Sequence, residues 1–259
     1  MITSVALVHN ALAFVLAALV PPVTAAQTPV VDSTTHHLRV DASGLRPIQL
    51  VYQMTLDRDT GTVILGTKMV STSVTSYVGS PAWLLVETRY LAGGVATDSL
   101  FATFSELTPL HWSAAQGSAR LASEFRADTT YGATSAPPGR RSIVSPIPPG
   151  TLVNGAMLET VLRLQPLYAT WEDSASVMSV SVSGNTVLPA RLAVIGEDRV
   201  RVPAGTFDCW VVSVRADPAR GLYWVSKQDP IVVRSAVDVP GLAPAGAAQL
   251  VSALTRIGR

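Results

Sequence analysis

Residues 48–61 read IQLVYQMTLDRDTG, and this stretch decides the fold class. Apolar side chains alternate with polar ones along it, with one exception at Val51; the apolar positions are Ile48, Leu50, Tyr52, Met54 and Leu56. A period of two residues is typical of a β-strand that buries one face. The polar cluster at 57–61 is typical of a turn. The stretch therefore predicts a half-buried strand and then a reversal of the chain.

Strand-like segments separated by turn residues continue through the rest of the chain. The further predicted strands cover residues 63–75, 83–90, 97–104, 110–114, 119–126, 178–183, 186–195, 199–202, 207–215, 222–226 and 231–237. Strands at a spacing of about ten residues are typical of an antiparallel meander, sandwich or barrel. The chain is therefore predicted to be mainly β.

One segment departs from the strand pattern. Prolines and glycines crowd residues 136–150, which predicts an irregular crossover. After it, apolar side chains at Met157, Val161 and Leu164 fall at helical spacing, and this pattern predicts one helix over about 156–165. The crossover is not interpreted as a domain boundary, because either half alone would carry an open sheet edge.

The tail at 246–257 is open to two interpretations. Its apolar residues have helical spacing, at Ala247, Leu250, Val251, Leu254 and Ile257. Its position at the end of a meander favours instead a last strand over about 248–256. We expect the strand.

The first 26 residues are typical of an export signal. An unbroken apolar run covers residues 11–20 and small residues follow at 23–26, which is the pattern of a secretory signal peptide. The run is too short for a membrane span. No Lys or Arg precedes it, so the true start of the chain stays open. We expect a periplasmic or secreted protein without a transmembrane span after signal removal, with a signal peptide at 1–26, a flexible tether at 27–45 and a single β-rich domain at 46–259.

The composition limits the classes of protein to which the chain can belong. Charged residues make up 14% of the 259 residues and apolar residues 48%, which is too apolar for an intrinsically disordered chain. The formal net charge is +1, and the basic residues are scattered along the chain. Because a nucleic-acid-binding protein usually carries a basic face, we expect no nucleic-acid partner.

Motifs that carry chemistry are missing from the sequence. It contains no H-E-x-x-H, no C-x-x-C and no G-x-S-x-G motif. His36 and His37 are adjacent on a polar segment, where neighbouring side chains point apart. A Ser/His/Asp arrangement would have to use His111 with Asp98 or Asp128. We therefore predict no catalytic residue, no metal ligand and no cofactor, and a protein that is not an enzyme.

Three further polar groups lie in or beside predicted strands. Glu87 and Glu106 are single acids, which is compatible with an outward face. Cys209 lies in an apolar strand, which predicts a buried or half-buried thiol. No basic residue is adjacent to lower its pKa, so we expect no reactive role.

The pattern V-x-V-P-A-G-T-F at 200–207, followed by Y-W-V-S at 223–226 and P-I-V-V-R at 230–234, resembles a family of exported bacterial proteins of unknown function. That family is similar to the periplasmic lipoprotein-localisation carriers. The resemblance implies an incomplete antiparallel β-barrel, open or half-closed, that wraps around helices and encloses a hydrophobic cavity. Within the motif, Pro203 and Gly205 predict a tight structural turn, with Gly205 at positive φ.

Five tryptophans, four of them in predicted strands, either fill the core or line an apolar cavity. Both interpretations stay open, because a half-open barrel permits both. The residues that we predict to line a ligand cavity are Trp83, Leu85, Phe101, Trp112, Trp210 and Trp224.

Three hypotheses for the function follow. The first is a non-enzymatic cell-envelope protein that binds or carries a lipid or other apolar small molecule in a half-barrel cavity. The second is a structural or interaction protein of the envelope with a filled core and a protein partner. The third is a hydrolase with a dispersed site, which a buried His111 hydrogen-bonded to an acid would favour. The ligand, the partner and the oligomeric state do not follow from the sequence.

Overall fold

The computed structural model describes residues 38–136, 139–181, 184–239 and 248–258, and fifteen strands in these residues form one sheet. One arm of the sheet contains β1 (Ile48–Arg58), β2 (Gly61–Tyr77), β3 (Ser80–Leu91), β4 (Gly94–Thr103), β5 (Pro109–Gln116), β6 (Ala119–Arg126), β7 (Thr129–Ala136) and β8 (Gly139–Pro146). The other arm contains β9 (Leu152–Val153), β10 (Glu172–Ser181), β11 (Gly184–Val202), β12 (Gly205–Ala216), β13 (Ala219–Ser226), β14 (Val232–Asp238) and β15 (Ala248–Gly258). The 3-10 helix η2 (Ala42–Gly44) precedes β1, and the helix α2 (Ala156–Leu164) connects β9 to β10.

The strand order places the two ends of the described chain side by side. The order is β8-β7-β6-β5-β4-β3-β2-β1-β15-β14-β13-β12-β11-β10-β9. Neighbouring strands pair antiparallel, except that β9 pairs parallel with β10. Two meanders therefore run outward from the central pair of β1 and β15.

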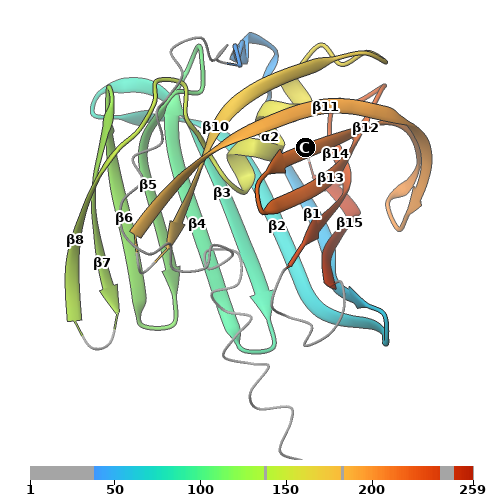
Figure 1. Ribbon diagram of the computed structural model, residues 1–259, viewed down its shortest axis with the longest axis horizontal. Coiled ribbons are helices and arrows are strands. Elements are labelled where there is room, and N and C mark those ends of the chain that lie inside the picture. Colours follow the sequence, from blue (N-terminus) through green and yellow to red (C-terminus); the bar gives the residue numbers. More distant parts are fainter. Residues whose placement is uncertain (1–37, 137–138, 182–183, 240–247, 259) are drawn as a thin grey trace, which may run out of the picture.

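The two arms curl toward each other without closing. Figure 1 shows β10 and β11 crossing in front of α2, so that the helix lies between the arms. The outermost strands, β8 and β9, do not pair with each other. Where the two arms approach each other, β11 contacts β8, and the Nδ2 atom of Asn185 donates to Oγ1 of Thr130 at 3.1 Å. The prediction of a mainly β, antiparallel, open barrel is therefore confirmed.

A bulge in β2 lets this long strand bend. Met54 pairs with Gly66, and the next residue of β1 pairs with Ile64, so Leu65 is an extra residue in β2. Gly66 has φ +150°, and a Cβ atom there would lie 1.9 Å from the carbonyl oxygen of Tyr90. Only glycine fits such an approach, and bulges increase the local twist of a strand pair.

The hydrophobic core lies between the arms and around α2. All residues from Ala156 to Arg163 are buried, whereas a surface helix buries only one stripe. Complete burial follows from the position of α2 between β3, β9 and β14, which all contact it. Two of the buried helix residues, Glu159 and Arg163, are charged. In the part of the chain that the structure describes, no helix has the length and the apolar character needed to span a membrane.

Three local predictions are confirmed. The helix predicted over about 156–165 is α2, which covers Ala156–Leu164. The tail forms β15, as the position at the end of the meander indicated, and its apolar residues pack as a strand. At the predicted turn, Gly205 begins β12 with φ +145° after the turn residue Pro203.

The predicted crossover at 136–150 is wrong over most of its length. Residues 139–146 form β8, which pairs with β7 in an antiparallel hairpin. Proline is tolerated here because β8 is an edge strand, and Pro146 is its last residue. Among the described residues of this segment, the irregular connection lies between Pro146 and Leu152.

The predicted tether at 27–45 is wrong for the residues that the structure describes. From Leu38 onward the chain packs against the core, because apolar side chains recur along it; the buried ones are Leu38, Val40, Ala42 and Leu45. The backbone N–H of Leu38 donates to Ser174 at 3.1 Å, which ties this segment to β10. The predicted signal peptide, residues 27–37 and the pair His36 and His37 lie outside the described residues.

Candidate functional site

A cavity of about 90 Å³ lies between the two arms, beside the start of α2. One wall is formed by the concave face of β3, β4, β5 and β6, and the other by β10 and the junction of β9 with α2. Two large side chains, Trp112 and Met178, lie on opposite walls. The wall strands belong to different arms, so no backbone hydrogen-bond ladder joins them across the cavity.

Small side chains leave this space open. Four alanines line the wall that β4, β5 and β6 provide, at Ala96, Ala114, Ala115 and Ala119. A methyl group fills far less volume than the Leu, Ile or Phe side chains that usually pack a barrel interior. The small side chains along these strands therefore account for the cavity.

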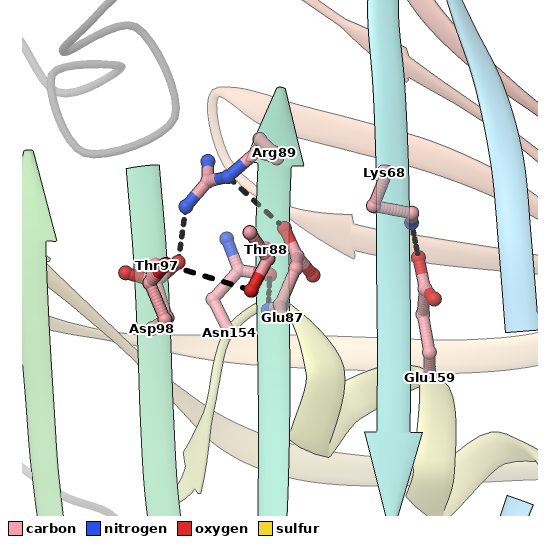
Figure 2. Close-up of polar contacts among 9 residues, drawn as sticks. Lys68, Glu87, Thr88, Arg89, Thr97, Asp98, Asn154 and Glu159 are labelled. Carbon is pink, nitrogen blue, oxygen red and sulfur yellow. Dashed lines mark hydrogen bonds and ion pairs between the residues drawn. The ribbon is translucent and has the colours of Figure 1, made fainter. Parts of the chain in front are cut away.

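A charged cluster on β3 and β4 borders the cavity. The register pairs Glu87 with Asp98, so both carboxylates lie on the concave face, and Arg89 follows two residues after Glu87 on the same face. The Nε atom of Arg89 lies 3.3 Å from Oε1 of Glu87, and its second terminal nitrogen (Nη2) donates to Oδ2 of Asp98. Figure 2 shows the guanidinium of Arg89 bridging the two carboxylates. The fully ionised cluster carries a net charge of −1, from two carboxylates and one guanidinium.

Burial sets the protonation of the cluster. The side chains of Glu87, Arg89 and Asp98 expose 6%, 12% and 28% of their surface. Burial raises the pKa of Asp98 to about 6, against the lowering effect of Arg89, and the carboxylate of Glu87 adds to the rise. Burial also lowers the pKa of Arg89, but Glu87 and Asp98 outweigh it and the net direction is upward. Asp98 can thus change charge close to neutral pH.

The start of α2 contributes polar groups to the same cavity. The Oδ1 atom of Asn154 accepts a hydrogen bond from the backbone N–H of Gly155 at 2.9 Å. Gly155 has φ +89°, and a Cβ atom there would lie 3.6 Å from Oε2 of Glu87. The Glu87 carboxylate therefore lies beside the N-terminus of the helix, where the helix dipole favours a negative charge.

A second ion pair lies deeper, between α2 and the sheet. The Nζ atom of Lys68 lies 2.5 Å from Oε1 of Glu159, and both side chains are at most 10% exposed. Burial raises the pKa of Glu159, although Lys68 opposes this effect. Figure 2 shows this pair beside the charged cluster of Glu87, Arg89 and Asp98.

Two carboxylate oxygens of the charged cluster can accept further hydrogen bonds. In the described residues no group of three or more metal-ligating side chains occurs. Arg89 engages one oxygen of each carboxylate. The second oxygen of Glu87 and of Asp98 accepts no hydrogen bond within the described part of the chain. Two acceptors in an apolar surrounding can therefore receive a hydrogen-bond donor from a ligand.

The structure places two of the predicted cavity residues at this site. Trp112 lines the cavity, and Leu85 lines a recess of about 10 Å³ next to it. Whether either side chain contacts a ligand stays a prediction.

The other four predicted cavity residues lie elsewhere. Trp83 is buried, donates from Nε1 to the carbonyl oxygen of Phe104 at 3.1 Å and stacks on its ring. Phe101 lies on the opposite face of β4, with its ring 5.0 Å from that of Tyr77. In the other arm, the ring of Trp210 lies under Lys227, and Trp224 donates from Nε1 to Asp198 at 3.0 Å.

His111 lies on the outer face of the sheet and has an acidic partner. Its Nδ1 atom lies 2.6 Å from Oε1 of Glu124, whose other oxygen accepts from the hydroxyl of Tyr77 at 2.9 Å. This partner differs from the predicted Asp98, which faces the cavity on the other side of the sheet, and from Asp128. Glu124 is 47% exposed, and no serine hydroxyl bonds to His111 within the described residues. The geometry is that of a polar contact on a sheet surface.

Sequence reasoning missed the charged residues of the site. Glu87 was expected to fit an outward face, but it is buried and faces the cavity. A signal was present, because Leu85, Glu87 and Arg89 share one parity along β3 with the apolar Trp83. Asn154 carries no signal of its own in the sequence; in the structure it directly precedes Gly155, the N-cap of α2.

Two solved structures are similar to this chain. One is a β-barrel-like protein of DUF1849 from Brucella abortus, with 12% identity, a TM-score of 0.49, and coverage of 85% of this chain and 98% of that one. The other is a DUF1329 family protein from Desulfovibrio piger, with 9% identity, a TM-score of 0.30, and coverage of 83% of this chain and 86% of that one. No curated protein matches the chain. Residues 51–243 match the family described as "Protein of unknown function (DUF3108)", and the chain therefore belongs to the DUF3108 family.

Proposed function

We propose that this protein is a non-enzymatic binding protein of the cell envelope, and that a lipophilic molecule with a hydrogen-bond-donating end enters the cavity between the arms. The observation that carries the proposal is the combination of an open, alanine-lined space with two carboxylate oxygens, on Glu87 and Asp98, that lack a hydrogen-bond donor among the described residues. Binding sites typically join apolar walls to a few convergent polar groups.

The size of the cavity limits what it takes in. At about 90 Å³ it is smaller than the 300–1,000 Å³ of typical ligand sites, so it holds one end of a ligand. A hydroxyl or amine would reach the carboxylates while the adjoining carbons contact Trp112 and Met178. A longer ligand requires the arms to move apart, and no backbone ladder across the cavity resists such a movement.

Ligand binding without chemical conversion fits the groups at the site. Both carboxylates are held by Arg89, and Asp98, with its pKa of about 6, can exchange a proton near neutral pH. Catalysis would also need a nucleophile or an activated water positioned next to such a group. Among the described residues, the cavity lining contains Ser179 and no cysteine or histidine.

Residence in the envelope rests on the sequence. The apolar run at 11–20 with small residues after it supports export, and the motif at 200–207 resembles proteins related to periplasmic carriers. A carrier role would require the ligand to be released again, which an unclosed barrel permits.

A titration with the fluorescent probe N-phenyl-1-naphthylamine tests the proposal. This probe is lipophilic, carries one N–H donor and brightens in apolar surroundings. The full-length protein should enhance its fluorescence. Ala114→Phe, which fills the cavity, should weaken binding by about tenfold or more. Ala122→Phe is the matched control, because Ala122 lies on neighbouring β6 and is absent from the cavity lining. Equal probe binding by the two variants, or no probe binding by the unmodified protein, would contradict the proposal and favour a structural or interaction role.

A further inference from the structure

A second cavity lies at the opposite end of α2. Its volume is about 470 Å³, which is within the range of ligand sites. Its lining includes Arg46, Ile48, Arg163, Leu164, Asp229 and Ile257. The C-terminal end of the helix, the start of β1 and the end of β15 meet there. None of these residues lines the first cavity.

The cavity has an apolar floor and a polar mouth. Leu45 and Ile231 are buried in the hydrophobic core, and the side chains of Leu164 and Ile257 pack against that core. Arg46, Pro47, Asp229 and Pro230 are exposed. An aliphatic chain would therefore be covered at the floor while a polar end stays near the mouth.

Arg163 brings a positive charge into this space. The residue is 7% exposed and lies in the last turn of α2. Its guanidinium makes no hydrogen bond and no ion pair within the described residues. Its burial lowers the pKa of the guanidinium, and Tyr52 and Glu159 act in the opposite direction. A buried cation without a hydrogen-bonded partner is costly, and an incoming anion would remove that cost.

Arg46 adds a second cation at the mouth. One terminal nitrogen of its guanidinium donates to the carbonyl oxygens of Ser43 at 2.8 Å and of Leu45 at 2.9 Å. These bonds hold the arginine at the edge of the cavity. Against the two arginines stands one carboxylate, that of Asp229, so the ionised lining carries a net charge of +1.

Helix capping alone does not account for this arrangement. A cation in the last turn of a helix interacts favourably with the dipole, and an exposed arginine would do so without the cost of burial. An anion bound in the adjoining open space would explain why Arg163 is buried there.

We propose that the second cavity binds a fatty carboxylate, with the carboxylate held by Arg163 and Arg46 and the chain lying on Ile48, Leu164 and Ile257. Arginine suits this ligand, because its planar fork matches both oxygens of a carboxylate. The site is separate from the first cavity, and its test is independent of the function proposed above.

Isothermal titration calorimetry on the full-length protein tests this site, with sodium decanoate and decyltrimethylammonium as probes, both below micelle formation. Decanoate should bind, and the cationic probe with the same chain should not. Arg163→Met and Arg46→Met should each weaken decanoate binding, the former by about tenfold or more. Arg256→Met is the matched control: Arg256 is exposed on β15 beside Ile257 but is not part of the lining, and binding should be unchanged.

Several outcomes overturn the inference. Equal affinity for both probes would show that the carboxylate is not recognised. The same affinity in Arg163→Met and Arg256→Met would remove Arg163 from the site. If Arg163→Met fails to fold, Arg46→Met is the deciding variant, because Arg46 is exposed. Unchanged decanoate binding by Arg46→Met would then count against the site. Ala114→Phe should bind decanoate normally, since it alters only the first cavity.

Discussion

Lys68 of β2 and Glu159 of α2 form an ion pair inside the barrel, with 2.5 Å between Nζ and Oε1. The pair joins the buried helix to the sheet and lies next to the cluster of Glu87, Arg89 and Asp98 that borders the first cavity (Figure 2). The other carboxylate oxygen of Glu159, Oε2, is buried and accepts no hydrogen bond from the part of the chain that the structure describes. The pair thus links α2, whose N-terminus borders the first cavity, to β2.

Removal of Lys68 should destabilise the protein strongly. Lys68→Met leaves the Glu159 carboxylate buried without its cation, which costs roughly 3–5 kcal/mol in comparable buried pairs. The double variant Lys68→Met/Glu159→Leu removes the uncompensated charge and should recover most of that loss. Urea unfolding of the three proteins measures both effects. A single variant as stable as the unmodified protein would contradict the buried pair.

The pKa of Asp98 predicts a specific pH dependence of stability. The folded value of about 6 exceeds the ordinary value of 3.8, so the unfolded chain loses this proton first as the pH rises. The contribution of Asp98 therefore favours the folded state at low pH and is lost between about pH 4 and 6. Over that interval the unfolding free energy of the unmodified protein should fall relative to Asp98→Asn by on the order of 1–3 kcal/mol. A constant difference across the pH series would refute the shift.

Gly66 should be the most sensitive glycine of the central strands. In Gly66→Ala the new methyl group would meet the carbonyl oxygen of Tyr90 at 1.9 Å, so β2 and β3 would have to separate. We expect a loss of about 2–4 kcal/mol in unfolding free energy. Gly61→Ala is the control, because Gly61 also has positive φ but no atom within 4 Å of the added Cβ, and should cost only about 1 kcal/mol. Equal losses would show that the close approach is not the cause.

Cys209 should be unreactive in the folded protein. The thiol is buried in β12, as the sequence predicted, and its pKa is raised to about 11 by burial and by the charges of Asp198 and Asp208. Iodoacetamide should label Cys209 slowly in buffer and rapidly in urea, since the thiolate is the reactive form. Rapid labelling of the native protein would place the thiol at the surface.

Local patterns predicted most strands and the helix because their signals are short-range. The alternation at 48–56 reports a strand with one buried face, and the structure has β1 there. The spacing of apolar residues within residues 156–165 predicted α2 for the same reason. The hairpin of β7 and β8 was missed because most of its residues are small, polar or proline, and an edge strand needs few apolar contacts.

The candidate site could not be predicted in the same way, because it depends on contacts between distant segments. Glu87 and Asp98 meet through the register of β3 and β4, and the cavity exists only because Met178 of β10 and Gly155 close it from the other arm. Of the six predicted cavity residues, Trp112 and Leu85 lie at the cavity or its recess, and the sequence contains no local signal that separates them from Trp83.

Mass spectrometry of the organic extract of the purified full-length protein tests the central claim most directly. The claim is that the space between the arms holds a lipophilic ligand. It predicts a co-purifying apolar molecule at about one per chain, retained by Ala122→Phe and lost from Ala114→Phe when both variants fold like the unmodified protein. An extract free of any bound molecule, or one that is identical for the two variants, would contradict the claim.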